Sequence, residues 1–512
     1  MKRIAMLLFS VLLIGIVVLD KDTKEPGKEL GVEVLSQEEI DSLCLEKEFA
    51  GFETDVQFEE QELGYDEAQN MLLIPQKLEE KYFHGKLQCA EGKLVFLADE
   101  LWNDKAGAMS SNHVFRLFRI GEEKYWMYNV YFTGMPVANL STVNVSEEEE
   151  HYGTIWIYDQ YSDSHRYQEG NCKFRLRGAS SLAFPKHSYK VTFTDKQYSL
   201  LGMRKDDDWM LHSLYDDEGL IHNKISYDLW KQIAQSNHVA NDEGISMEFV
   251  ELFVDNEYLG VYGLSERIDK KALGLNEKDI LYKGVDIKDI GEDDFYLELT
   301  EDMTPTFELK YPQTFTKEHW EPLKNWYYGL NEKQIIDYEE ATKILNMENA
   351  IDYQLFLNFI SGGDNIRKNT YYWADYQSDD TYQIVKIPWD LNMTWGNGWY
   401  TEHKYHFNMY QEKYIDVIWA TQKDMEYLYE LNSDDMNKKM YARWKELRER
   451  IITEENIYAM LDSQFNYIHS SGSYIRDCLF WGSREEYWSD SYIYDYTRRK
   501  IESMDKYMES IK

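Results

Sequence analysis

The stretch from Ser361 to Gly396 constrains the fold more than any other part of the chain. It holds two runs rich in aromatic and β-branched residues, TYYWADYQ and TYQIVKI. The polar segment Ser378-Asp379-Asp380 separates them. Two such runs on either side of a short polar segment predict an antiparallel β-hairpin. We therefore expect a hairpin between the Gly-rich segment Gly362-Gly363 and Pro388.

Polar side chains flank this hairpin in an order that suits phosphoryl transfer. Asp364 lies in the Gly-rich turn, Asn369 follows five residues later, and Asp390 closes the hairpin. In such chemistry one carboxylate positions the attacking hydroxyl, while an amide and a second carboxylate hold magnesium against the phosphates. The protein-kinase catalytic loop carries Asp and Asn at the same spacing, with a metal-binding Asp further on. Asp and Asn are also common in plain β-turns, so this pattern alone leaves both interpretations open.

The composition favours a large folded protein and argues against nucleic-acid binding. The 512 residues are enough for two or three domains or for one elaborated two-lobed enzyme. Hydrophobic residues make up 43%, which allows a large core. A net charge of −38 argues against the basic face that non-specific nucleic-acid binding requires. The 41 Tyr and 15 Trp residues fit sugar-stacking surfaces or, more simply, a Tyr-rich core.

The N-terminus has the pattern of an export signal. Lys2 and Arg3 precede an apolar run from Ile4 to Leu19, which ends at Asp20-Lys21-Asp22. A charged segment followed by a hydrophobic one is typical of secretory signals, and the run is short for a full membrane span. We expect residues 1–20 to be a signal peptide or a membrane anchor, and the rest to be exported, either extracellular or anchored on the outer face.

Four cysteines are spread along the chain. None belongs to a C-x-x-C motif or a His/Cys cluster, which disfavours a structural zinc site. Export would permit disulfides, and four cysteines allow three pairings. Buried free thiols are the alternative.

Along the chain, β-like segments come first and helix-like segments last. Residues 21–80 are acidic and polar, and we expect a stalk or loosely packed prefix there. Residues 81–150 are expected to form a small β-rich segment, and residues 151–512 the main domain. Helical patterns dominate residues 317–360 and 423–512. This order predicts an α+β fold with two lobes, a β-rich N-terminal part and a helix-rich C-terminal part.

A Gly/Ser turn joins two of the strand-like runs. It reads Arg177-Gly178-Ala179-Ser180-Ser181, and Lys186 and Lys190 follow it. Backbone N–H groups in such a turn can cradle phosphates, and a lysine can neutralise them. The alternative is an ordinary hairpin with exposed basic residues.

Two further segments bear on a nucleotide site. MEFVELFV and YLGVYGLSE, on either side of Asp255-Asn256-Glu257, predict a second β-hairpin. We expect the segment that follows, Ser265-Glu266-Arg267-Ile268, to be a hinge between the lobes that contacts the nucleotide. Asp206-Asp207-Asp208 has the composition of a metal site, although a capping or loop role is the better interpretation.

Several of these stretches together resemble the spore-coat CotH family of atypical protein kinases. The matching pieces, in the family's order, are RLRGASSLAFPKHSYKVTF, LLGMRKDDDWMLHSLYDDEGLIHNKISYDLW, VELFVDNEYLGVYGLSERID, and DNIRKNTYYW with IPWDLNMTWG. The resemblance implies a kinase-like domain over residues 151–512 that uses ATP and Mg²⁺ (or Mn²⁺). It also implies protein substrates with Ser or Thr, including spore-coat proteins, and hence a spore-coat location.

Carried onto this chain, the resemblance gives each motif a role. Asp364 would be the catalytic residue, with Asn369 and Asp390 on the metal. Together with the expected hinge, the nucleotide-binding residues would be Arg177, Gly178, Ser180, Ser181, Lys186 and Glu266.

Two positions depart from the family pattern. Asn392 stands where the family often has a second Asp, and His222 stands where Arg is common. An amide carries no charge, so Asn392 weakens the case for two tightly held metal ions. An active Ser/Thr kinase is the first hypothesis. The alternative is a catalytically degenerate surface or cell-wall (carbohydrate) binding protein on the same scaffold.

Overall fold

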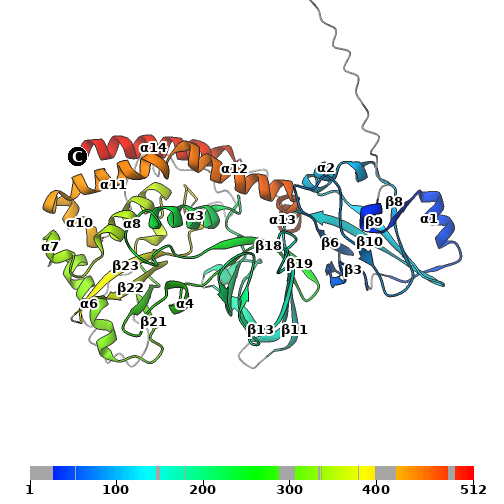
Figure 1. Cartoon of the computed structure of the whole chain (residues 1–512), viewed down its shortest axis with the longest axis horizontal. Coiled ribbons are helices and arrows are strands. Elements are labelled where there is room, and N and C mark those ends of the chain that lie inside the picture. The colour runs from blue at the N-terminus through cyan, green and yellow to red at the C-terminus, as the bar shows by residue number, and fades with distance from the viewer. Residues whose placement is uncertain are drawn as a thin grey trace, which may run out of the picture.

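The structure is a computed structural model with three parts arranged in a row. It describes residues 27–51, 54–145, 150–178, 180–287, 306–332, 335, 337–378, 380–397, 423–482 and 490–512. Figure 1 shows an N-terminal sheet at one end, a β-barrel in the middle and a helix-rich part at the other end. Both helices and sheets build it, so the expected α+β class is confirmed.

The N-terminal part is built on a seven-stranded sheet. The strand order is β1-β8-β9-β10-β6-β5, and β2 pairs with β10. The strands are Glu33–Leu35 (β1), Glu48–Phe49 (β2), Gly64–Asp66 (β5), Met71–Pro75 (β6), Lys93–Leu97 (β8), Phe115–Ile120 (β9) and Lys124–Thr133 (β10). Helices Gln37–Cys44 (α1) and Lys105–Ser110 (α2) flank them, and Gln57–Phe58 (β3), Gln61–Glu62 (β4) and Leu87–Gln88 (β7) form a small second sheet.

Residues 27–80 contribute to this sheet, which corrects the expectation of a loosely packed prefix for the described part of that segment. Strand β6 pairs in parallel with β10, so that Met71 lies opposite Asn129. Leu72, Leu73 and Ile74 of β6 are fully buried. Strands β1, β2 and β6 are short and pair with strands that are distant in sequence, so local composition carries little sign of these pairings. The division of the chain into domains remains a prediction.

The middle part is a closed seven-stranded barrel in the order β11-β12-β13-β14-β17-β19-β18. Its core is formed by inward side chains such as Phe174, Val191, Trp209 and Leu211. Closure pairs both edges of the sheet, which removes exposed strand edges. The antiparallel pairing of β18 with β19 confirms the expected second hairpin. The barrel strands are Val137–Val145 (β11), His151–Tyr158 (β12), Tyr167–Arg177 (β13), Ser188–Phe193 (β14), Asp208–His212 (β17), Met247–Val254 (β18) and Glu257–Ser265 (β19), with a small pair Tyr198–Ser199 (β15) and Lys205–Asp206 (β16) beside them.

The helix-rich part contains a four-stranded antiparallel sheet in the order β21-β20-β22-β23. Its strands are Ile280–Gly284 (β20), Phe307–Tyr311 (β21), Thr370–Tyr376 (β22) and Tyr382–Pro388 (β23). The β22–β23 pairing confirms the hairpin expected from the sequence, and it sets Thr370 opposite Pro388. The residues just outside these two ends, Asn369 and Trp389, are therefore brought together.

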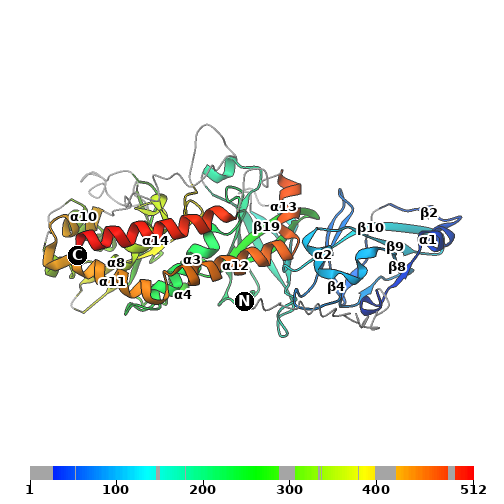
Figure 2. The ribbon, with the colours of Figure 1, turned by 90° about the horizontal axis from the view of Figure 1, so that it is seen from above.

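Helices cover this sheet and run back towards the barrel. Helix α8 (Met347–Ile360) is almost entirely buried and ends at Ser361, whose φ of 55° turns the chain towards Asp364. Seen from above, α12 and α14 lie over the helix-rich part and the barrel (Figure 2). The other helices are His222–Ala234 (α3), Lys270–Leu273 (α4), Glu321–Trp326 (α6), Tyr338–Ala341 (α7), Lys423–Glu430 (α10), Met436–Arg450 (α11), Glu454–Ser470 (α12), Ser473–Trp481 (α13) and Ser491–Ile511 (α14).

The structure also bears on two expectations from the sequence, the membrane anchor and the state of the cysteines. Within the described ranges, no helix combines the length and apolarity needed to cross a membrane. The expected signal or anchor at residues 1–20 lies outside the described residues. Cys44, Cys89 and Cys172 carry free thiols, which agrees with the free-thiol alternative for these three, and Cys478 is buried.

Helix α13 ties the barrel to the N-terminal part through a buried ion pair. Arg476 donates from Nε to Glu251 Oε1 over 2.7 Å and from Nη2 to Glu251 Oε2 over 3.0 Å. Its Nη1 donates to Asn112, just after α2. Arg476 is 4% exposed and Glu251 0% exposed. A bidentate pair removed from water depends on both partners, because either charge alone would be buried without compensation.

Arg476→Met should therefore destabilise the protein by about 3–5 kcal/mol, the cost of leaving a buried charge unpaired. Urea unfolding followed by tryptophan fluorescence measures the loss. The matched control is Arg498→Met, whose partners Asp495 and Glu502 lie on the exposed face of α14. That variant should lose less than about 1 kcal/mol. Equal losses in the two variants would contradict the structural role of the Arg476–Glu251 pair.

Candidate active site

A cavity of about 590 Å³ opens between the barrel and the helix-rich part. Its walls come from barrel strands β13, β14 and β17, from β20 and β21, from the loops at Asp364 and Asp390, and from the first turn of α3. This volume is in the range of small-molecule sites. The charged lining residues are Arg175, Arg177, Lys190, Arg267, Lys283, Lys310, Lys368, Asp216, Glu308, Asp364 and Asp390.

The three residues expected to carry the chemistry all line this cavity. They are Asp364, Asn369 and Asp390. The Nδ2 of Asn369 donates to Asp364 Oδ2 over 2.8 Å, and Lys368 Nζ lies 3.1 Å from the same oxygen. No described residue forms an ion pair or side-chain hydrogen bond with the Asp390 carboxylate. The loop thus holds Asp364 in place and leaves Asp390 open to the cavity.

A buried asparagine that the sequence reasoning missed fixes this loop. Asn365 is fully buried, and its Nδ2 donates to the carbonyl oxygens of Asn369 (3.1 Å) and Trp389 (2.7 Å). One side chain therefore ties together both ends of the β22–β23 hairpin. Asn369 and Asp390 both have positive φ, 56° and 57°. Asn and Asp tolerate this left-handed backbone better than most residues.

Helix α3 holds the Asp390 segment from the other side. The backbone N–H of Asp390 donates to Tyr227 Oη over 3.0 Å, and that of Leu391 donates to Asn223 Oδ1 over 2.7 Å. The sequence analysis assigned no role to these two contacts. Both residues lie in a stretch that matches the family, but they stand more than 160 residues before Asp390, so the sequence does not show that they contact it.

The two departures from the family pattern have structural roles. His222 is buried, with Nδ1 2.6 Å from Asp217 Oδ1 and Nε2 2.6 Å from Tyr492 Oη. It therefore fixes the start of α3. Asn392 lines the cavity, and its Nδ2 donates to Asp216 Oδ2 over 2.7 Å.

The Gly/Ser turn reaches the cavity through three of its residues, Arg177, Gly178 and Ser181. Gly178 has φ 132°, and a Cβ there would lie 2.2 Å from the Ser181 hydroxyl oxygen, so the turn requires glycine. Ser180 begins the short 3₁₀ turn Ser180–Ala183. Arg177 Nη1 contacts His212 Nδ1 at 3.3 Å.

The structure brings Lys190, not Lys186, into the cavity. Lys186 is 1% exposed, and its Nζ donates to Asp477 Oδ2 (2.5 Å) and to the Val261 carbonyl oxygen (2.7 Å). A lysine with these partners has a structural position outside the cavity. Lys190 lines the cavity, with its Nζ 3.2 Å from Asp208 Oδ1.

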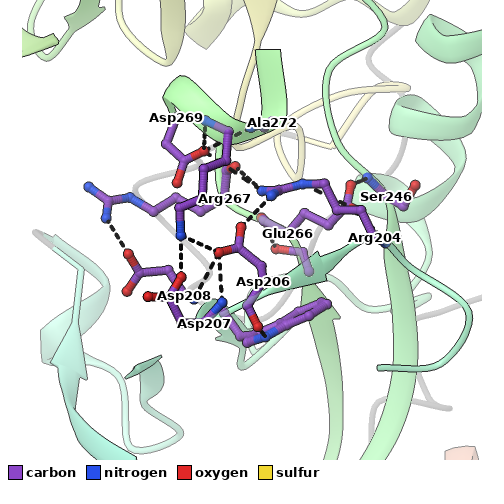
Figure 3. Close-up of polar contacts among 12 residues, drawn as sticks. Arg204, Asp206, Asp207, Asp208, Ser246, Glu266, Arg267, Asp269 and Ala272 are labelled. Carbon is purple, nitrogen blue, oxygen red and sulfur yellow. Dashed lines mark hydrogen bonds and ion pairs between the residues drawn. The ribbon is translucent and has the colours of Figure 1, made fainter. Parts of the chain in front are cut away.

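Asp206, Asp207 and Asp208 form an ion-pair network with cations from neighbouring segments (Figure 3). Burial alone would raise the pKa of Asp206, but hydrogen bonds with Asp207 and Lys271 and the charge of Arg204 lower it to about 2. The three carboxylates are therefore neutralised by the protein's own cations. In the described part of the chain, no three His, Cys, Asp or Glu side chains are grouped as a metal site.

Asp208 connects this network to the cavity. It accepts from Thr192 Oγ1 over 2.6 Å and pairs with Lys190 (3.2 Å) and Arg267 (3.1 Å). Both cations line the cavity. One carboxylate therefore orients two positive side chains at the cavity wall.

Glu266, the expected hinge residue, belongs to the same network and does not line the cavity. Its carboxylate accepts backbone N–H groups of Arg204 (3.0 Å) and Ser246 (2.8 Å). It therefore holds the chain where β19 ends, beside Arg204 (Figure 3). The next residue, Arg267, is the one that lines the cavity.

The electrostatics of the cavity contrast with those of the whole protein. Seven Lys or Arg residues and four Asp or Glu residues line it, although the net charge of the chain is −38. A concave, positively charged wall attracts anions. Burial raises the pKa of Asp364, the charge of Asp390 raises it further, and Lys368 acts in the opposite direction. Burial and the neighbouring Arg177 hold the pKa of His212 well below its usual range, so His212 is neutral.

Asp364→Asn should raise the free energy of unfolding at neutral pH. The pKa of Asp364 is above its ordinary value of 3.8, so folding disfavours the ionised form. The ionised Asp364 therefore destabilises the folded protein fully at a pH above its pKa in the folded state. This destabilisation disappears as the pH falls to the pKa of Asp364 in the unfolded state. Urea unfolding of both proteins at decreasing pH should show the gain shrink towards pH 3.8.

The matched control for this measurement is Asp163→Asn, since the Asp163 side chain is 91% exposed. It should change stability little at any pH. A variant Asp364→Asn that is less stable than wild type at pH 7, or that gains stability towards acid, would contradict the assigned direction of the pKa shift.

Comparison with known proteins identifies the family of this chain. A family model described as CotH kinase protein matches residues 174–509, a range that includes every residue lining the cavity. Inner spore coat protein H of Bacillus subtilis (strain 168) is 26% identical over 225 residues, which are 43% of this chain and 58% of that protein. The chain therefore spans less than two thirds of the length of this relative. Because the family model covers more than half of the sequence, the chain belongs to the CotH kinase protein family.

Proposed function

We propose that this protein is an ATP-dependent phosphotransferase that phosphorylates Ser or Thr in protein substrates. One observation carries the proposal: Asp364, Asn369 and Asp390 line the same cavity as the Gly178 turn and an excess of cations. Phosphoryl transfer needs little covalent help from a protein, and positioning with charge stabilisation supplies most of its catalysis. This cavity contains the groups for both.

The arrangement of the parts supports a two-lobed kinase-like interpretation. The barrel supplies the Gly/Ser turn and Lys190, while the helix-rich part supplies Asp364, Asn369 and Asp390. A nucleotide bound between two such lobes would contact basic side chains of the barrel and carboxylates of the helix-rich part. In this interpretation the barrel is the β-rich lobe and residues from β20 onwards are the helix-rich lobe.

The donor set fits Mg²⁺ or Mn²⁺ held together with ATP. Hard divalent cations favour oxygen ligands, and Mg²⁺ is commonly bound by one or two carboxylates plus substrate phosphates. Asp390 has no cationic partner among the described residues, and Asn369 offers its Oδ1 because its Nδ2 is bound to Asp364. The charge of Asp390 also raises the pKa of Asp364, a repulsion that a shared cation would relieve. When bound, the metal nucleotide supplies the phosphoryl group and a divalent positive charge.

In this proposal, the residues of the cavity have different roles in phosphoryl transfer. Asp364 accepts the hydrogen bond of the substrate hydroxyl and orients it, and its raised pKa makes it a better proton acceptor than an ordinary Asp. Asn369 keeps the Asp364 carboxylate in one orientation. Lys190 and Arg267, held by Asp208, present positive charge to the anionic ligand.

The proposed roles of Asp364 and Asp390 predict that substituting each residue impairs a different step. Asp364→Asn should leave Mg²⁺-dependent ATP binding near wild type while turnover falls by about 10²-fold or more, the scale of lost base and positioning help. Asp390→Asn should weaken ATP binding and turnover together, because a metal ligand is lost. Calorimetry with ATP and Mg²⁺, paired with labelled-phosphate transfer to a Ser/Thr-containing protein, separates them.

The exposed variant Asp163→Asn serves as the control and should match wild type in both assays. If Asp364→Asn loses ATP binding while Asp390→Asn keeps it, the two roles are reversed. If wild type binds ATP without transferring phosphate, the protein is a degenerate binder on this scaffold. Normal transfer by both site variants would place the chemistry elsewhere.

We also propose a spore-coat or cell-surface location. The relative named inner spore coat protein H supports the first, and the charged and then apolar residues 1–20 support export. Deletion of residues 1–20 should shift the protein to the cytoplasmic fraction, while the full chain is recovered outside it or on the membrane. Cytoplasmic recovery of both forms would contradict export.

A further inference from the structure

The lysines of the cavity differ in whether a carboxylate neutralises them. Lys190 pairs with Asp208, Lys310 pairs with Glu308, and Lys368 pairs with Asp364. Lys283 also lines the cavity, but it forms no ion pair or hydrogen bond with any residue that the structure describes. A half-buried ammonium group without an anionic partner is unfavourable, and such a charge is retained where a ligand supplies the anion.

The strand register explains why Lys283 has no partner. Lys283 lies opposite Glu308 of β21 on one side and opposite Tyr371 of β22 on the other. Glu308 contacts Lys310, two residues along the same strand and on the same face. One carboxylate thus faces two lysines and pairs with one of them. On the other side, Tyr371 contributes only its aromatic ring, whose centre lies 5.8 Å from Lys283 Nζ.

A second cation without a carboxylate partner approaches from the barrel. Arg177 contacts neutral His212, and its guanidinium lies over the Trp389 ring at 5.7 Å. Burial lowers the pKa of Lys283 to about 8; Lys310 and Arg177 lower it, and the charge of Asp390 acts in the opposite direction. Lys283 and Arg177 are therefore electrostatic neighbours whose mutual repulsion an anion between them would relieve.

The position of Lys283 is fixed relative to the proposed metal ligands. The next residue, Gly284, accepts the backbone N–H of Asn369 at its carbonyl oxygen over 3.1 Å. A Cβ at Gly284 would lie 1.9 Å from the Arg367 carbonyl oxygen, so this strand end packs directly against the Asp364–Asn369 loop. An anion at Lys283 is therefore adjacent to Asn369 and within the electrostatic reach of Asp390.

We propose that Lys283, together with Arg177, forms the anion site that binds the phosphate chain of the nucleotide. The proposal rests on the proposed function, since it names the residues that take the phosphates in that same cavity. It assigns to Lys283 the role that the sequence gave to Lys186. Lys283 belongs to strand β20 of the helix-rich part, whereas Arg177 reaches the site from the end of barrel strand β13.

The test compares Lys283→Met with wild type in binding titrations with ATP, with adenosine and with inorganic tripolyphosphate, each with Mg²⁺. Loss of a charge-assisted hydrogen bond should weaken ATP and tripolyphosphate binding by roughly 10- to 100-fold. Adenosine carries no phosphate, so its affinity should not change. Lys283→Arg keeps the charge and should recover much of the tripolyphosphate binding.

Two controls separate a binding defect from a folding defect. Lys278→Met removes a lysine just before the same strand, where the side chain is 59% exposed, and should leave all three affinities unchanged. Lys283→Met should be at least as thermally stable as wild type, because it removes a cation that forms no ion pair with any described residue. Lys186→Met should lower the melting temperature strongly, since it removes the cation that compensates the buried Asp477 carboxylate.

The outcomes distinguish this inference from the proposed function. Phosphate transfer by wild type with equal ATP binding in Lys283→Met overturns the anion site and leaves the function standing. Tripolyphosphate binding that depends on Lys283, without phosphate transfer by wild type, keeps the anion site and overturns the function. If wild type binds neither ATP nor tripolyphosphate, both fail.

Discussion

Two hydrogen bonds from the buried amide of Asn365 set the geometry on which the site depends. They join the carbonyl oxygens of Asn369 and Trp389, one at each end of the β22–β23 hairpin. Asp364 immediately precedes Asn365 and Asp390 immediately follows Trp389, so their separation follows from the contacts of one side chain and from one strand register. Like charges in one cavity repel each other, and only a well-braced loop can hold them together. Helix α3 supplies the second brace through Asn223 and Tyr227.

Charge is distributed in the cavity so that some cations are compensated and others are not. Asp208 holds Lys190 and Arg267 from the barrel side, and Glu308 holds Lys310 from the sheet side. These pairs fix the cations in place while reducing the repulsion among them. Arg177 and Lys283 lack carboxylate partners among the described residues. The side chains of such a site are held in place without a ligand, and its uncompensated positive charges still attract an anion.

The sequence predicted local patterns well and distant contacts poorly. The two hairpins, the Asp364–Asn369 spacing and Asp390 were all visible, because each depends on neighbours along the chain. The burial of Lys186 was not, since its partner Asp477 lies 291 residues away. Strand β6 was missed for a similar reason, as it pairs with β10 across a long intervening segment. Lys283 stands in no motif, and Asn365 stands in a matching motif without an assigned role, so only the structure shows what these two residues contact.

The position of Lys186 also shows how a structural residue can shape the site indirectly. The segment from Arg177 to Lys186 leaves the barrel, passes the cavity at Gly178 and Ser181, and returns to β14. Its first end is held by Arg177 against His212 and Trp389, and its last end by the Lys186–Asp477 pair on α13. Gly260 allows this, because a Cβ there would lie 2.2 Å from Asp477 Oδ2. A turn fixed at both ends loses less conformational freedom when a ligand binds, so a buried ion pair outside the cavity preorganises the turn within it.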